Sequence, residues 1–198
     1  MKRKEFTILE STCVPLPLAN IDTDQIIPAR FLNSTTREGF GKNLFCDWRY
    51  DREGKRKKDF ILNRPEYGGS ILLAGTNFGC GSSREHAVWA IADYGFRAVV
   101  SDSFADIFSN NALNNGLLPV EIPAETLGIL NEQIISNPQT KVKIDLEKQV
   151  LSSEEAGISV SFAINAFKKE CLLKGLDNID YLLGIRDEIT AFEERRSS

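Results

Sequence analysis

The chain has 198 residues, enough for one domain to bury a sizeable hydrophobic core without help from metals or disulfides. Its composition, 42% hydrophobic and 26% charged, is that of an ordinary globular protein, and a net charge of -4 argues against nucleic acid and anionic membranes as main partners. The four cysteines lie far apart in the sequence and there is one histidine, so we expect no metal or iron-sulfur site held by this chain alone.

The N-terminus has only part of a secretion signal. Met1 to Lys4 has the charge of a signal peptide's first region, but two acids and two prolines interrupt the apolar run that should follow. No stretch reaches the ~20 apolar residues that a membrane-spanning helix needs. We therefore expect a cytoplasmic protein whose cysteines are free thiols.

The N-terminal segment predicts little regular structure. Residues 6–9 predict a short strand, and two prolines interrupt the apolar run 14–18. Asp22 and Asp24 follow, one residue apart, and on an extended segment their carboxylates would share one face. An isolated pattern of this kind more often forms an Asx-turn or a helix cap, and we favour this structural interpretation.

Residues 31–64 form a long loop region without clear periodicity. The charged run 51–59 predicts a solvated hairpin tip, because it is too short and too diluted by acids for a nucleic-acid surface. Loops of this length are usually functional or disordered. We expect this one to lie near a site or a partner.

The middle of the chain alternates short apolar runs with helical segments. In order, they predict a strand, a helix, a strand, a helix and a strand, at 70–74, 83–94, 97–101, 104–115 and 117–122. A β-α-β-α-β order predicts a parallel sheet with right-handed crossovers.

Each of these two helices is preceded by a serine with an acid three residues later, Ser82 with Glu85 and Ser103 with Asp106. This spacing is typical of a capping box. Both helices should start at the carboxyl ends of neighbouring strands, where open α/β sheets bind ligands. The two serine loops are therefore predicted to lie side by side.

The C-terminal part predicts a helix, a hairpin pair and two further helices, at 125–136, at 141–145 with 158–162, at 163–174 and at 186–195. The last two helices form a tail over 163–198. No internal repeat divides the chain, and we predict one domain over 1–198.

The most informative stretch is 75–87, which holds three glycines, two serines, an arginine and the only histidine. A glycine-rich turn that enters a helix presents unpaired N–H groups and the positive end of the helix dipole, and Arg84 adds a fork that matches a carboxylate. The stretch therefore predicts an anion site. The dinucleotide fingerprint fails at Arg84, the hydrolase elbow fails at Glu85, and no Gly-Lys-Ser/Thr follows for a P-loop.

Residues 79–87, with 22–28 before them and 103–108 and 116–119 after them, closely resemble the swivelling domain of the aconitase superfamily. Within it the resemblance is to the isopropylmalate dehydratase small-subunit family. It covers nearly the whole chain, and the Gly-Ser-Ser-Arg-Glu-His string is highly specific. It implies an α/β fold, a swivelling β/β/α domain with a mostly parallel β-α-β-α-β core and additional strands.

The resemblance also implies an activity and a partner. In this family, 2-isopropylmalate loses water to give isopropylmaleate, which regains water to give 3-isopropylmalate, in leucine biosynthesis. A large subunit carries a 4Fe-4S cluster through three cysteines that have no counterpart in this chain. We expect a small dicarboxylate substrate, no cofactor on this chain, and a hydro-lyase that is active only with the large subunit.

The resemblance assigns roles to five residues. Ser82 is the base that takes a proton next to a carboxylate, with its alkoxide stabilised by N–H groups, the helix dipole and Arg84. Arg84, with Gly81 and Ser83 beside it, binds a substrate carboxylate. Asp24 pairs with a histidine of the large subunit to protonate the leaving hydroxyl. The residues alone would instead make Ser82 a helix cap.

Substrate selection is assigned to the loop 30–36. Phe31 and Leu32 are expected to line an apolar pocket, in which a buried isopropyl group gains roughly 2 kcal/mol. A tricarboxylate would need another cation, for which Arg30 is in reach. Arg37 resembles a second carboxylate-binding arginine, and a solvated loop charge fits it equally well.

Three other functions stay open. The small subunit of a citraconate hydratase or of a homoaconitase would use the same chemistry, and a non-catalytic anion-binding module would use Ser82 only as a cap. His86 lies two helix positions after Arg84 and so points away from it. We predict that His86 orients the helix or contacts a partner, and is not a base.

Overall fold

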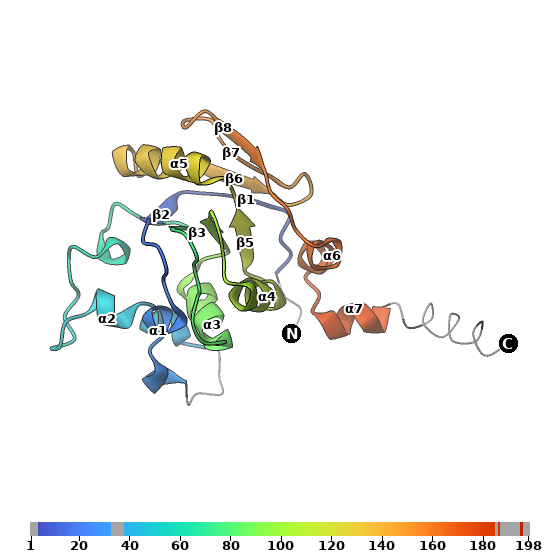
Figure 1. Cartoon of the computed structure of the whole chain (residues 1–198), viewed down its shortest axis with the longest axis horizontal. Helices are drawn as coiled ribbons and strands as arrows, with labels where there is room; N and C mark the ends of the chain where they lie inside the picture. Colours follow the sequence, from blue (N-terminus) through green and yellow to red (C-terminus); the bar gives the residue numbers. More distant parts are fainter. Residues whose placement is uncertain (1–3, 33–37, 185, 187–194, 196–198) are drawn as a thin grey trace.

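The computed structural model describes residues 4–32 and 38–184, with Arg186 and Arg195. Two four-stranded sheets form adjacent layers, and helices cover them (Figure 1). Apart from its two end residues, the helix predicted at 186–195 lies outside the described residues, as does the predicted site residue Arg37. Among the helices of the described part, none has both the length and the apolar character that crossing a membrane requires.

The central sheet is parallel, with the strand order β2-β3-β4-β5. Its strands are β2 (Cys13–Leu16), β3 (Ile71–Ala74), β4 (Ala98–Ser101) and β5 (Leu118–Glu121). Helix α3 (Glu85–Tyr94) connects β3 to β4, and α4 (Asp106–Asn114) connects β4 to β5. The predicted β-α-β-α-β unit is therefore confirmed.

Both edge strands of this sheet contain a proline. Pro15 of β2 lies opposite Leu73, and Pro119 of β5 lies opposite Val99. Proline has no N–H group to donate, so within a sheet it is confined to such edges. Our prediction that prolines interrupt the run 14–18 is wrong for Pro15, because β2 passes through it and ends at Leu16.

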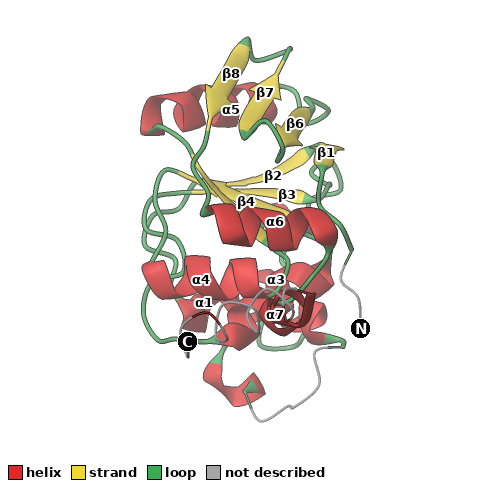
Figure 2. Ribbon diagram, turned by 90° about the vertical axis from the view of Figure 1, so that its right-hand side faces the viewer, coloured by secondary structure: helices red, strands yellow, loops and turns green. Residues whose placement is uncertain are grey.

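The two faces of the parallel sheet contribute side chains to separate hydrophobic cores. Leu72 and Val99 pack with residues of α3 and α4 on one face, and Ile71 and Val100 pack toward the other sheet. Figure 2 shows α3 and α4 on one side of the sheet, and α5 (Ala124–Ser136) with the second sheet on the other. Because both faces are covered, the strands are continuous apolar runs and not alternating ones.

The second sheet is antiparallel, in the order β1-β6-β7-β8. Its strands are β1 (Ile8–Ser11), β6 (Val142–Asp145), β7 (Val150–Ser153) and β8 (Ile158–Ser161). We predicted that the segments of β6 and β8 pair with each other, which is wrong because β7 lies between them and pairs with both. The sequence Val-Leu-Ser-Ser of β7 offers too short an apolar pattern to identify a strand.

The helix predicted at 125–136 is confirmed as α5. Helix α6 (Ala166–Lys174) starts three residues later than predicted, because Asn165 caps it by accepting the N–H of Lys168 at 3.2 Å. It ends at Gly175 in the left-handed conformation. Helix α7 (Asn178–Gly184) was not predicted.

The described part of the region 31–64 is packed on α3 through a buried arginine. Arg49, at the end of α2 (Cys46–Arg49), is 4% exposed and donates to the carbonyl oxygens of Gly41, Lys42 and Leu44 at 3.2–3.4 Å. Its guanidinium also lies over the ring of Tyr94 in α3, at 4.8 Å. The predicted hairpin tip follows α2 and is confirmed by the pairing of Tyr50 with Arg56.

Two glycines fix the path of the chain after β3. Gly79 and Gly81 have φ angles of 76° and 86°, in the left-handed region that L side chains rarely adopt. A Cβ on Gly79 would also lie 2.2 Å from the buried ring of Phe108, whereas a Cβ on Gly81 would meet nothing closer than 3.4 Å. Space and conformation both require Gly79, and conformation alone requires Gly81.

This difference predicts unequal stability losses. Gly79→Ala should lower the free energy of unfolding by about 2–4 kcal/mol, because it adds overpacking against Phe108 to backbone strain. The matched control Gly81→Ala should lose only about 1–2 kcal/mol from strain. Urea unfolding followed by tryptophan fluorescence measures both, and equal losses would contradict the assigned clash.

Candidate active site

The candidate site lies at the carboxyl ends of the parallel strands, where three segments meet. The segment after β3 pairs with the segment after β2 at Cys80 and Asp22, and with the segment after β4 at Phe78 and Phe104. The hydroxyl of Ser103 accepts the N–H of Asn77 at 2.9 Å. The two serine loops are therefore side by side, as predicted.

Neither serine caps its helix, and both predicted capping boxes are wrong. The N-cap residues are Arg84 for α3 and Ala105 for α4, and neither helix has a side-chain cap. The chain enters α3 in an extended conformation at Arg84, so Ser82 lies before the N-cap position. The hydroxyl of Ser103 instead accepts a hydrogen bond from the N–H of Asn77 in the neighbouring loop.

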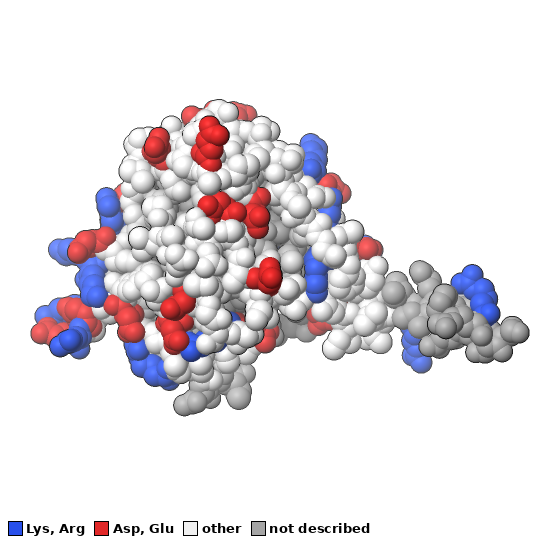
Figure 3. Space-filling model, viewed as in Figure 1, with Lys and Arg blue, Asp and Glu red and all other residues white. Residues whose placement is uncertain are grey.

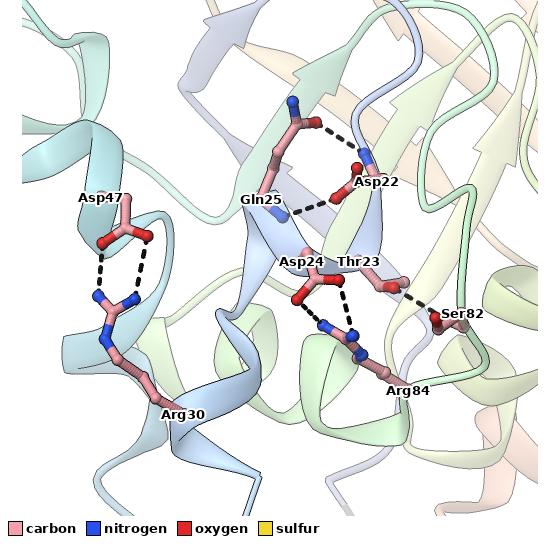
Figure 4. Close-up of polar contacts among 8 residues, drawn as sticks. All are labelled: Asp22, Thr23, Asp24, Gln25, Arg30, Asp47, Ser82 and Arg84. Carbon is pink, nitrogen blue, oxygen red and sulfur yellow. Dashed lines mark hydrogen bonds and ion pairs between the residues drawn. The ribbon is translucent and has the colours of Figure 1, made fainter.

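The capping box is found at the start of α1 (Thr23–Ile26). The carboxylate of Asp22 accepts the N–H of Gln25 at 2.8 Å, and the side chain of Gln25 accepts the N–H of Asp22 at 2.9 Å (Figure 4). The expectation of an Asx-turn or a helix cap in this segment is thus confirmed, in the form of a helix cap. It leaves Asp24 in the first turn of α1, facing the loop that carries Ser82.

Ser82 presents a free hydroxyl at this edge. Its side chain is exposed, as is that of Ser83, and neither hydroxyl bonds to another residue of the described ranges. The main-chain N–H groups of Ser82, Ser83 and Arg84 also find no acceptor among those residues. Several unused donors therefore lie in consecutive residues just before α3, next to this hydroxyl in the chain, and such a segment is suited to an anion.

Arg84 is already paired in this structure. Its guanidinium binds both carboxylate oxygens of Asp24, with Nη2 at 2.7 Å from Oδ2 and a second, shorter contact beside it (Figure 4). The arginine side chain is 14% exposed and the carboxylate 54%. The hydrogen bond from Arg84 lowers the pKa of Asp24. The structure thus brings Ser82, Ser83, Arg84 and Asp24 together.

The selectivity loop is described only in part. Phe31 and Leu32 are half-buried and pack against the core below the parallel sheet. Arg30 binds both oxygens of Asp47, and its Nη2 lies 3.0 Å from Sγ of Cys46 (Figure 4). Arg30, the cation expected to be in reach of a tricarboxylate, is therefore engaged.

His86 is held by two aromatic rings. Its ring centre lies 4.5 Å from that of Trp89 and 5.4 Å from that of Phe40. These contacts join α3 to the 3-10 helix Phe40–Asn43. This packing is consistent with a residue that orients the helix, and its role stays a prediction.

Sequence reasoning missed one residue of this site. Thr23 is 3% exposed, and its hydroxyl donates to the carbonyl oxygen of Ser82 at 2.9 Å (Figure 4). The two residues are 59 positions apart, and a threonine between two aspartates carries no signal of such a contact.

The residues present do not fit an iron-sulfur cluster. Within the described ranges, no three His, Cys, Asp or Glu side chains gather as metal ligands would. Cys13 and Cys171 are buried, and burial raises the pKa of the Cys13 thiol well above its usual range. Cys46 and Cys80 are partly exposed free thiols.

Comparison with known proteins gives consistent matches. A family model described as the aconitase C-terminal domain matches residues 3–125. The 3-isopropylmalate dehydratase small subunits of Cytophaga hutchinsonii and Christiangramia forsetii are 55% and 56% identical, over 96% and 98% of this chain and 95% and 94% of those proteins. A crystal structure of the 3-isopropylmalate dehydratase of Methanocaldococcus jannaschii superposes with a TM-score of 0.66 at 29% identity, over 94% of this chain and 99% of that one.

The ion pair predicts a titration that can be measured in the free chain. Asp24 should titrate below its ordinary pKa of 3.8, and Arg84→Gln should return it toward that value. Because the folded-state pKa is the lower one, the pair's contribution to stability is present above the ordinary pKa. It is lost as the pH falls through the folded-state pKa.

Carboxyl carbon NMR follows both aspartates in one experiment. Asp47, whose pKa is lowered by its hydrogen bond from Arg30, is the internal control and should not respond to Arg84→Gln. An Asp24 that titrates at its ordinary value in the unmodified chain would contradict the pairing.

Proposed function

The chain belongs to the family of 3-isopropylmalate dehydratase small subunits, and we propose that it supplies the base and a carboxylate-binding arginine to that enzyme in the cytoplasm. The observation that carries this proposal is the exposed hydroxyl of Ser82, in a segment of unused N–H groups two residues before Arg84. The reaction is the exchange of 2-isopropylmalate and 3-isopropylmalate through isopropylmaleate, in leucine biosynthesis.

Ser82 is the proposed base. Its oxygen removes the proton from the carbon next to a substrate carboxylate, and the electron pair left behind forms the double bond of isopropylmaleate. The hydroxyl of the adjacent carbon leaves as water, with a proton from the large-subunit histidine that is proposed to pair with Asp24. A serine hydroxyl is a very weak acid, so its deprotonated form needs stabilisation. The N–H groups of Ser83 and Arg84 and the start of α3 are the donors available for this.

The large subunit is the proposed partner. Gly81, Ser82 and Ser83 are all exposed in the isolated chain, so the proposed base lies on an open face. An open face supports a site that is completed by a second polypeptide. We assign the 4Fe-4S cluster to that polypeptide, because the described residues of this chain do not fit it; there it would supply Lewis-acid chemistry to the substrate hydroxyl.

Asp24 and Arg84 are proposed to exchange partners on assembly. When a histidine of the large subunit pairs with Asp24, the fork of Arg84 becomes available for a substrate carboxylate. Gly81 and Ser83 flank that position. In the free chain the two charges neutralise each other, which avoids leaving a mostly buried guanidinium unpaired.

The surface charge supports a small-molecule substrate and a protein partner. On the face shown in Figure 3, acidic side chains are scattered over the centre and basic ones lie toward the sides. A nucleic-acid or anionic-membrane surface would need a continuous basic patch.

A dicarboxylate with an apolar branch is the proposed substrate. Leu32 and Phe31 offer apolar surface near the site, and Arg37 remains a candidate for a second carboxylate. A tricarboxylate such as homoaconitate would require Arg30 to leave its pair with Asp47. Citraconate, whose methyl group is smaller than isopropyl, stays the closest competing substrate.

Ser82→Ala tests the base in the reconstituted enzyme. With a cluster-loaded large subunit, kcat should fall by at least about 10²-fold, because a positioned base contributes about 10²- to 10⁴-fold. The absorbance of isopropylmaleate measures the rate. Ser159→Ala, on the exposed side of β8, is the control and should leave kcat unchanged. A loss of only a few fold would favour the non-catalytic anion-binding module.

Leu32→Ala tests the selectivity loop. The value of kcat/KM for isopropylmalate should fall about fivefold, because roughly half of the ~2 kcal/mol from burying an isopropyl group is lost. Hydration of citraconate, whose methyl group makes fewer contacts, should change less than threefold. The rate with homoaconitate, measured in the same assay, tests whether Arg30 can leave Asp47 to bind a third carboxylate. An equal loss of kcat/KM on all three substrates would contradict the placement of Leu32 in the substrate pocket.

A further inference from the structure

Among the described residues, Thr23 is the one whose side chain contacts the main-chain carbonyl of Ser82, the proposed base. Its hydroxyl donates to that oxygen of Ser82 at 2.9 Å, and its own N–H donates to the carbonyl of Cys80 at 2.9 Å. Within the described ranges the Ser82 carbonyl accepts no other hydrogen bond. Thr23 itself is 3% exposed, so its hydroxyl has a fixed position and few other acceptors.

Holding this carbonyl also fixes the opposite end of the same peptide group. The peptide bond between Ser82 and Ser83 is planar and trans, so its C=O and N–H point in opposite directions. When the C=O points inward to Thr23, the N–H of Ser83 points away from it. That N–H is one of the unused donors beside the Ser82 hydroxyl.

The need for such a contact follows from the local sequence. Gly81 comes directly before Ser82, and glycine allows the chain many conformations. Ser82 precedes the first residue of α3 by three positions and is not held by helix hydrogen bonds. An external hydrogen bond therefore decides how the peptide after Ser82 is oriented.

We propose that Thr23 is a positioning residue for the reaction, which holds the Ser82–Ser83 peptide so that its N–H faces the Ser82 oxygen and the substrate. The proposal rests on the proposed function of Ser82. It gives each residue of the string Asp22-Thr23-Asp24 a separate task, because Asp22 caps α1 and Asp24 pairs with Arg84.

Thr23→Val is the informative variant, because it keeps the branched shape and removes only the hydroxyl. In the reconstituted enzyme, kcat should fall about ten- to a hundredfold, the range expected for misplacing a catalytic group by about 1 Å. KM should change less than threefold. Thr23→Ser, which keeps the hydroxyl, should retain kcat within about threefold of the unmodified enzyme.

Two further measurements separate positioning from simple stability. Thr140→Val, which removes another fully buried threonine hydroxyl on the far side of the parallel sheet, should leave kcat unchanged. With substrate deuterated at the carbon that loses its proton, the isotope effect on kcat should rise in Thr23→Val, because proton removal becomes slower relative to other steps. A purely structural role would leave this isotope effect unchanged.

Three results would overturn the proposal while leaving the function of Ser82 intact. They are a Thr23→Val enzyme with kcat within twofold of the unmodified one, equal losses for Thr23→Val and Thr23→Ser, and an unchanged isotope effect. Failure of the proposed function is a different result, in which the unmodified complex shows no isomerisation or Ser82→Ala shows no loss.

Discussion

The backbone hydrogen bonds that extend the parallel sheet past its strands are the constraint on which the site depends. Gly79 donates to Ile21 on one side, and Phe78 exchanges hydrogen bonds with Ser103 and Ala105 on the other. The segment is thus held between its two neighbours before it turns toward Ser82. This requires a left-handed residue without a side chain at Gly79, since Phe108 fills the space beside it. The serine is displayed by a fixed backbone and not by a free loop.

Electrostatics then explain why the free chain is stable with a cationic site. Arg84 is mostly buried, and an unpaired guanidinium there would be costly. Asp24 removes that cost while remaining half exposed, so it can respond to a new partner. The same surface is consequently neutral in the isolated chain and cationic toward a ligand once Asp24 is engaged elsewhere. The proposed function therefore couples recognition of the substrate to recognition of the second polypeptide through one ion pair.

Local patterns in the sequence were sufficient to predict the parallel core and to locate the candidate site. Apolar runs and the glycines after each helix identified β3, α3, β4, α4 and β5, and the glycine-serine string identified the anion-binding edge. Contacts between residues far apart in the sequence could not be predicted from local patterns. The pairing of Arg84 with Asp24 spans 60 positions, and the buried Arg49 looked like any loop charge. The capping boxes were misassigned because the same serine spacing also fits a loop whose backbone turns at glycines before the helix starts.

Pro15 and Pro119 have a consequence for how the molecule meets other chains. Each removes an N–H donor from an outermost strand of the parallel layer, so neither border can template a continuous run of intermolecular β-pairing. A subunit synthesised ahead of its partner is thereby protected against edge-to-edge aggregation while it waits. The proposed contact with the second polypeptide lies instead at the end of the sheet where Ser82 is exposed.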